Sequence, residues 1–147
     1  MNADQPIVYD KAKYHSEFIE EQGLPEEHAY NHTTFFMSWL VKNRLMSDFF
    51  ESESKDEVEK YRSGQTTINQ LYEWWDCCLV SDMLSERGNA FARSYFDFEN
   101  GSYLSDYEQY LKKNLPSEFH VPYTADNERV IHQVIKSRYE EWNRLQS

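Results

Sequence analysis

Cysteine is scarce in this chain, which has only Cys77 and Cys78, next to each other. We expect the pair inside a helix, where adjacent side chains point to different faces, so the sequence predicts no intrachain disulfide. No run of 18 apolar residues is present, and the N-terminus lacks an apolar segment behind a basic start. From these absences we expect that the chain has no membrane span and no secretory signal. The expected location is therefore the cytoplasm.

Glycine and proline are also few, with four of each, and no stretch is repetitive or linker-like. Nothing therefore marks an internal boundary, and we predict a single domain over residues 1–147 with a partly irregular segment at 1–23. A domain of this length buries about 68–70% of the surface of its unfolded chain. Aromatic residues make up 16% of the sequence, so the core is expected to consist largely of rings.

Positive charge is in deficit: 15 Lys and Arg stand against 26 Asp and Glu, giving a net charge of −11. A field of this sign repels the phosphates of nucleic acids and of anionic lipids, and it speeds encounter with a basic protein. We therefore expect a basic protein partner, no direct nucleic-acid binding and no membrane binding. The alternative is that the acidity only keeps a ring-rich protein soluble.

Apolar residues recur at helical spacing, which predicts an all-α fold, a bundle of about five helices. The clearest stripes lie in residues 24–45, 68–83 and 102–114 and from about residue 126 onward, and a helix after Gly88 is expected to reach Tyr95. Thr67 with Gln70, and Ser54 with Glu57, have the spacing of helix-capping boxes. Ahead of these, residues 6–10 read as a short extended piece and residues 14–21 as a possible short helix.

Motifs for catalysis are missing: the chain has no G-x-S-x-G elbow and no Gly-rich phosphate loop. A buried helical cysteine is usually a small hydrophobic residue rather than a nucleophile. We therefore predict no catalytic residues, no cofactor and no enzyme. His28 and His32 are four residues apart, a spacing at which two imidazoles can share a metal ion, but a glutamate between them and a third ligand are lacking. The prediction is no metal site, with a small helical metal-dependent enzyme using His28 and His32 as an alternative.

An acidic segment at residues 48–59 is the most suggestive local feature. Carboxylates there could attract a basic partner, and the adjacent aromatic rings could anchor it in a pocket. The alternative is a solvated loop and helix face with both phenylalanines turned into the core. The predicted partner-binding residues are Asp48, Phe49, Phe50, Glu51, Glu53, Asp56, Glu57 and Glu59.

Several stretches together resemble a family of uncharacterised bacterial helical proteins that are often encoded near secreted polymorphic toxins. They are YDKAKYH at 9–15, the run from LPEEH to NRL at 24–45, GNAFARSYF at 88–96, YLSDYEQYL at 103–111, FHVPYTADN at 119–127 and RYEEW at 138–142. The resemblance implies a helical domain, without an established activity. It also implies that certain polar residues meet around one groove or in one interior network: His32, Asn89, Tyr95, Tyr103, His120 and Thr124. The acidic stretch at 48–59 departs from the plain version of this pattern.

The sequence as a whole favours an immunity-type protein that neutralises a bacterial toxin or another basic protein by direct binding. Its acidic charge, the acidic segment and the missing catalytic motifs all agree with this function. One alternative is an inhibitor that mimics nucleic-acid charge and occupies a DNA- or RNA-binding protein, as phage-type inhibitors do. The other is the metal-dependent enzyme described above.

Overall fold

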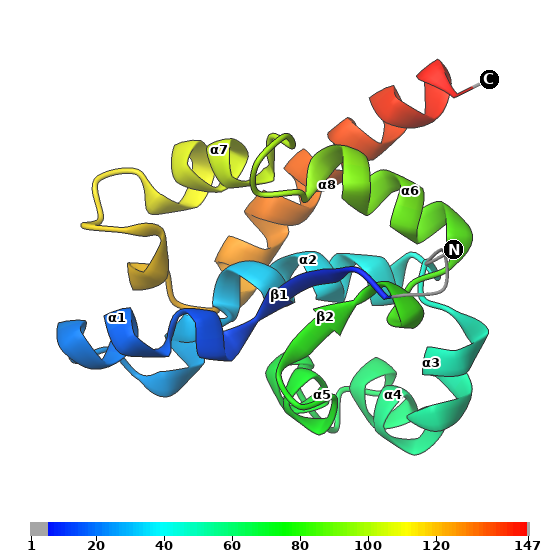
Figure 1. The fold of residues 1–147 in the computed structure, drawn as a ribbon, viewed down its shortest axis with the longest axis horizontal. Coiled ribbons are helices and arrows are strands. Elements are labelled where there is room, and N and C mark those ends of the chain that lie inside the picture. Colours follow the sequence, from blue (N-terminus) through cyan, green and yellow to red (C-terminus); the bar gives the residue numbers. More distant parts are fainter. Residues whose placement is uncertain (1–5, 147) are drawn as a thin grey trace.

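The computed structural model describes residues 6–146 of the chain. Within these residues there are eight α-helices and one two-stranded sheet (Figure 1). In chain order they are β1 (Val8–Lys11), α1 (Ser16–Gln22), α2 (Asn31–Lys42), α3 (Asp48–Glu53), α4 (Lys55–Arg62), α5 (Ile68–Trp74), β2 (Cys78–Val80), α6 (Glu86–Tyr95), α7 (Tyr103–Tyr107) and α8 (Ala125–Leu145). The mainly helical class is confirmed. The count of about five helices was too low, because short turns divide the helical stretches.

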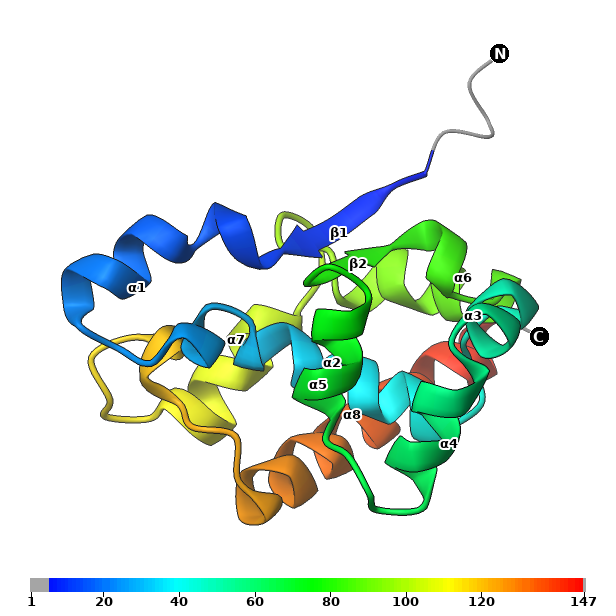
Figure 2. The same ribbon diagram turned by 90° about the horizontal axis from the view of Figure 1, so that it is seen from below.

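Helix α2 is the centre of the fold. Every residue from Asn31 to Val41 is buried, so the helix presents no face to water. A helix with this property must be covered on all sides. In Figures 1 and 2 it runs through the middle of the molecule, packed against α8 on one side and α5 on another. The rings of Phe35 and Phe36 are fully buried in one continuous core to which residues from β2 to α8 contribute.

The two strands explain where the helix prediction for residues 68–83 was wrong. Helix α5 ends at Trp74, and Asp76 and Cys77 then take left-handed backbone angles, with φ of 59° and 55°. The chain reverses there and β2 pairs antiparallel with β1, which confirms the extended piece predicted near the N-terminus. Pairing with β1, a distant segment, therefore outweighs the local helical pattern at residues 78–80. The spacing of apolar residues along the sequence cannot reveal such a pairing.

Helix caps were predicted correctly in one case and wrongly in another. Thr67 and Gln70 form the reciprocal capping box at the start of α5. Ser54 does precede α4, but its hydroxyl donates to the carbonyl of Phe50 at 2.8 Å and accepts from the indole of Trp75 at 3.1 Å. Because that oxygen is committed to helix packing, no side-chain cap forms with the first turn of α4.

An ion pair between a buried carboxylate and a partly exposed arginine fastens the C-terminal helix to the rest of the fold. Asp106 of α7 has 3% of its side chain exposed and accepts two hydrogen bonds from the guanidinium of Arg138 in α8, at 2.8 and 2.9 Å. The hydroxyl of Tyr95, from α6, donates to the same carboxylate at 2.7 Å. Three helices therefore meet at one charge that is removed from water.

We predict that Arg138→Met lowers the free energy of unfolding by about 2–3 kcal/mol, because it leaves the buried Asp106 carboxylate without its cation. Urea unfolding followed by tryptophan fluorescence measures this change. The matched control is Arg129→Met on the same helix, which breaks only an exposed pair with Asp126 and should cost less than about 0.5 kcal/mol. Equal losses in the two variants would show that the buried pair has no special role.

Candidate functional site

An exposed row of aromatic rings joins α3 to the end of α5. Phe49 is 50% exposed and Trp74 is 47% exposed, although both are large apolar side chains. The ring of Trp75 lies between them, with its centroid 5.8 Å from that of Phe49 and 5.3 Å from that of Trp74. Trp75 in turn stacks on the buried Phe50, so the exposed rings rest on the core and present a fixed surface.

Exposed carboxylates lie close to these rings in the chain, on α3 and α4 and at the end of α5. Asp48, Glu53 and Asp56 are exposed, and so are Glu73 and Asp76 at the end of α5. None of these five makes an ion pair within residues 6–146. We call Asp48, Phe49, Glu53, Asp56, Trp74 and Trp75 the acidic–aromatic surface. In Figure 1 its helices α3, α4 and α5 lie together, away from α1 and α7.

Some residues predicted for partner binding are committed inside the chain. Phe50 is fully buried and cannot anchor a partner, so that assignment was wrong. Glu51 forms a two-pronged hydrogen-bonded pair with Arg62, which also lowers the pKa of Glu51. Glu59 lies 3.6 Å from Lys55, and Glu57 is half-buried. Trp74 was missed, although adjacent side chains of the helix predicted over residues 68–83 point to different faces, so that one ring of the pair Trp74 and Trp75 should point outward.

The six polar residues expected around one groove do not meet in one. Three of them form an interior network: the hydroxyl of Tyr103 donates to the carbonyl of His32 at 2.6 Å, and the rings of Tyr95 and Tyr103 touch at 5.6 Å. The other three have separate partners. Asn89 accepts from the hydroxyl of Tyr9, His120 bonds with Ser117, and Thr124 caps α8. The contacts therefore join three of the six residues in an interior network and give the other three separate partners.

Asp10 is the centre of a second polar cluster, at the junction of the N-terminal segment with α2. This carboxylate is 1% exposed, and it lies 2.8 Å from Nε2 of His15 and 3.1 Å from Nε2 of His32. The hydroxyl of Thr33 donates to it at 2.6 Å. Burial by itself would raise the pKa of Asp10, but the contacts from His15 and His32 outweigh it and hold that pKa well below its usual value. We call Asp10, His15, His32 and Thr33 the Asp10 cluster.

The pairing of His28 with His32 does not occur. His28 lies in a separate turn of 3-10 helix, Glu26–Ala29, ahead of α2, and its Nδ1 bonds to the carbonyl of Phe119 at 2.7 Å. His32 faces Asp10 instead. Sequence spacing failed here because the two residues are not on one continuous helix. Burial, the largest effect, raises the pKa of both Cys77 and Cys78, which disfavours a reactive thiolate at either position.

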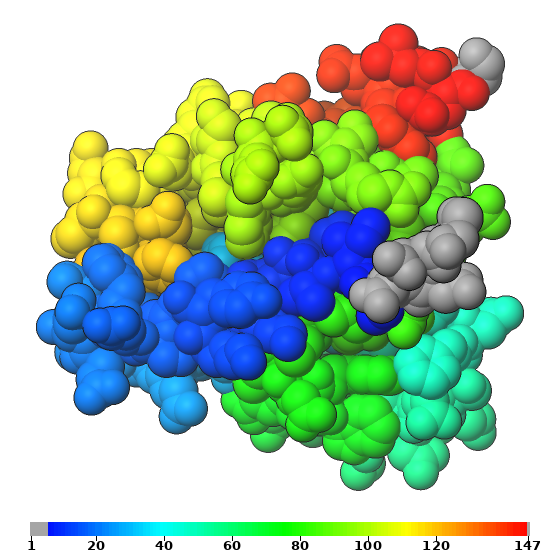
Figure 3. Space-filling model, viewed as in Figure 1, coloured from blue at the N-terminus to red at the C-terminus, as the bar shows by residue number. Residues whose placement is uncertain are grey.

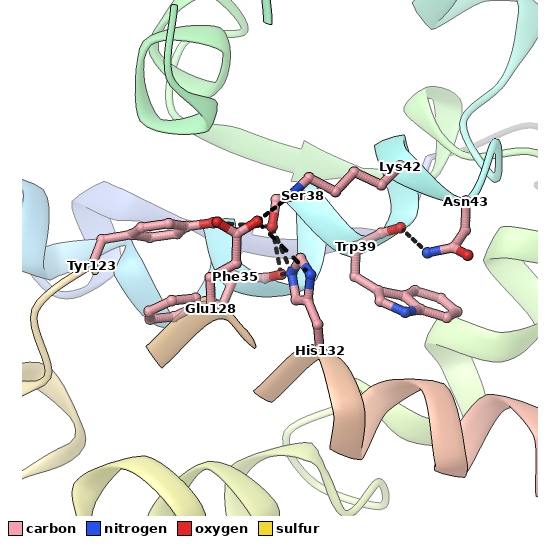
Figure 4. A network of polar contacts seen from close by, with 8 residues as sticks. All are labelled: Phe35, Ser38, Trp39, Lys42, Asn43, Tyr123, Glu128 and His132. Atoms are coloured by element: carbon pink, nitrogen blue, oxygen red, sulfur yellow. Dashed lines mark hydrogen bonds and ion pairs between the residues drawn. The ribbon is translucent and has the colours of Figure 1, made fainter. Parts of the chain in front are cut away.

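A groove of about 620 Å³ lies between the end of α2 and the first half of α8. Beside it, His132 of α8 reaches α2, where its Nε2 is 2.8 Å from Oγ of Ser38 and 3.0 Å from the carbonyl of Phe35 (Figure 4). Lys42 pairs with Glu128 across the same gap. The lining residues are Trp39, Lys42, Asn43, Ala125, Glu128, Arg129, His132, Gln133 and Lys136. None of them was among the predicted site residues.

The structure is that of a mainly helical protein with two candidate sites, the acidic–aromatic surface and the Asp10 cluster. Among the described residues there is no recognisable catalytic constellation. The family "Domain of unknown function (DUF7832)" matches residues 8–121, and the chain belongs to this family. The match includes the acidic–aromatic surface and the Asp10 cluster but stops before α8. No curated protein and no solved structure matches the chain. None of the described helices is both long and apolar enough to cross a membrane.

The environment of His132 generates a pH-dependent prediction. Burial lowers the pKa of His132, Lys42 acts in the same direction, and the nearby Glu128 only partly opposes them. In the range just below pH ~6.5, the unfolded chain takes up a proton that the folded chain refuses, so stability falls as the pH falls. The free energy of unfolding should decline by up to about 1.4 kcal/mol per pH unit there.

Chemical unfolding at a series of pH values on both sides of the ordinary histidine pKa of ~6.5 tests this prediction. His132→Gln should flatten the decline, because the titrating ring is gone. His120→Gln, which leaves the contacts of His132 intact, should keep it. A decline of equal steepness in wild type and His132→Gln would assign the effect to other groups.

Proposed function

We propose that this protein acts by binding, and that the acidic–aromatic surface is where it holds a basic protein partner. The observation that carries the proposal is the exposure of Phe49 and Trp74, supported from below by Trp75 and edged by carboxylates without cation partners. Single exposed apolar side chains are common, whereas two large rings joined through a third are typical of the centre of an interface.

Charged and aromatic side chains have different roles at such a surface. The carboxylates attract a basic partner over a distance of about one Debye length and raise the rate of encounter. The rings then supply most of the affinity, because aromatic side chains bury a large area with little loss of side-chain entropy. Trp75 and Phe50 are held in place by stacking, so the surface is ordered before the partner arrives.

The proposed class of function is that of an immunity-type protein, which neutralises a toxic basic protein by direct contact and without catalysis. The net charge of −11 supports it, as does the family resemblance on which the toxin partner rests. Cytoplasmic location is part of the same proposal. An inhibitor that mimics nucleic-acid charge is the alternative, in which the partner is a DNA- or RNA-binding protein and nucleic acid competes for it.

The test is affinity capture from the native host with the immobilised full chain, at low and at moderate salt. The triple variant Asp48→Lys, Glu53→Lys, Asp56→Lys reverses the charge of the surface and should weaken retention at least a hundredfold. Trp74→Ser removes one exposed ring and should weaken it at least tenfold, as expected for an interface hot spot, for which about 1.4 kcal/mol is tenfold. The captured protein should be toxic when produced without this chain and harmless when produced with it.

A matched control separates the surface from bulk charge. Glu17→Lys, Glu21→Lys, Glu140→Lys changes the net charge by the same amount at exposed positions on α1 and α8. This control should retain the partner like wild type. Equal weakening by both triple variants would mean that only the total charge matters, and unchanged capture by the Asp48, Glu53, Asp56 variant would contradict the proposal. Displacement of the partner by DNA or RNA would select the nucleic-acid mimic.

A further inference from the structure

The Asp10 cluster brings together three side chains whose nitrogen and oxygen atoms could also bind a metal ion. One ligand-type atom from each of Asp10, His15 and His32 lies within 4.8 Å of the other two. The three residues come from the end of β1, the turn before α1 and the first turn of α2. We propose that Asp10, His15 and His32 bind one divalent transition-metal ion of the zinc class and that this ion fastens the N-terminal segment to α2.

The chemistry of the three donors fits such an ion. Two neutral imidazole nitrogens and one carboxylate oxygen are a recurrent protein ligand set for zinc and for other first-row divalent metals. Two ligands, each about 2.1 Å from a tetrahedral zinc ion, lie ~3.4 Å apart. In the cluster, the carboxylate oxygens lie 2.8 and 3.1 Å from the two Nε2 atoms, so small side-chain shifts suffice to admit an ion. The two histidines come together although 16 residues of chain lie between them.

Surrounding contacts already orient the donors. Thr33 donates to the carboxylate of Asp10 at 2.6 Å, the kind of outer contact that fixes a ligating carboxylate. The ring of Phe119 lies 5.0 Å from that of His15 and 5.3 Å from that of His32, so an apolar wall limits the approach of water. His15 keeps 19% of its side chain exposed, which gives an ion a route to the otherwise buried donors.

Hydrogen bonding leaves the ring of His32 weakly held for a buried polar side chain. His32 is 2% exposed, and its Nδ1 has no hydrogen-bond partner among the described residues. If Asp10 is the only partner of this ring, one buried polar atom is unpaired, at a cost that native proteins usually avoid. A metal ion on Nε2 would supply a bond to His32 much stronger than the single contact at 3.1 Å, while Nδ1 would carry the ring proton and stay without a partner. This inference is independent of the proposed function.

The experiment is isothermal titration of ZnCl₂ into the full chain, purified without a histidine tag and stripped with a chelator. One zinc ion per chain should bind with micromolar or tighter affinity, and zinc should raise the midpoint of thermal unfolding. His15→Gln, at the partly exposed ligand, should weaken binding at least a hundredfold. His132→Gln is the matched control: His132 lies on α8 and bonds to Ser38 and to the carbonyl of Phe35, and its loss should leave zinc binding unchanged.

A second readout does not depend on the folding of any variant. Nitrogen-15 NMR of the imidazole rings in the wild-type chain should show zinc-induced shifts at Nε2 of His15 and His32 and none at His28, His120 or His132. Absence of stoichiometric zinc binding would overturn the proposal. So would binding that His15→Gln leaves unchanged, or shifts confined to histidines outside the cluster.

Discussion

The complete burial of helix α2 is the constraint on which the rest of the structure depends. Its sequence places Asn31, His32, Thr33, Thr34 and Ser38 among apolar residues, and every one of these polar side chains is buried. A buried polar group without a partner is costly, so the surrounding segments must supply partners. Asp10 supplies them to His32 and Thr33, Asn69 and the carbonyl of Val121 to Asn31, and Tyr123 and His132 to Ser38. The N-terminal segment, which crosses one face of the molecule in Figure 3, is held to α2 by such contacts as well as by β2.

The same constraint separates the polar residues that serve the interior from those that do not. Tyr103, Tyr95 and Asp106 serve the interior, where they tie α6, α7 and α8 together. The acidic–aromatic surface has no such duty, because its carboxylates lack ion-pair partners within residues 6–146 and two of its rings are about half exposed. Interior polar groups therefore explain stability, and the surface groups without such a role are the ones that we propose for recognition.

Local chemistry made part of the fold predictable. The apolar spacing located α8 from about residue 126, the possible short helix at 14–21 matches α1, and the Thr67–Gln70 box located α5. The prediction failed where distant segments decide. Residues 78–80 form a strand because β1 lies beside them, and His32 points to Asp10, which is 22 residues away in the chain and has no periodic relation to it. For the candidate surface, the acidic segment was visible in the sequence. Which of the two phenylalanines is buried was not, because the burial of Phe50 and the exposure of Phe49 depend on how α3 packs on Trp75.

Native-state hydrogen exchange in increasing denaturant tests the central role of α2 most directly. If its buried polar partners hold the surrounding segments in place, the amides of residues 35–41 exchange only through global unfolding, and they are the slowest in the chain. The short helices α1, α3 and α4 exchange by local opening at lower free energy. Exchange of α2 amides by local opening, at a free energy no higher than that of α3 or α4, would contradict this description of the fold.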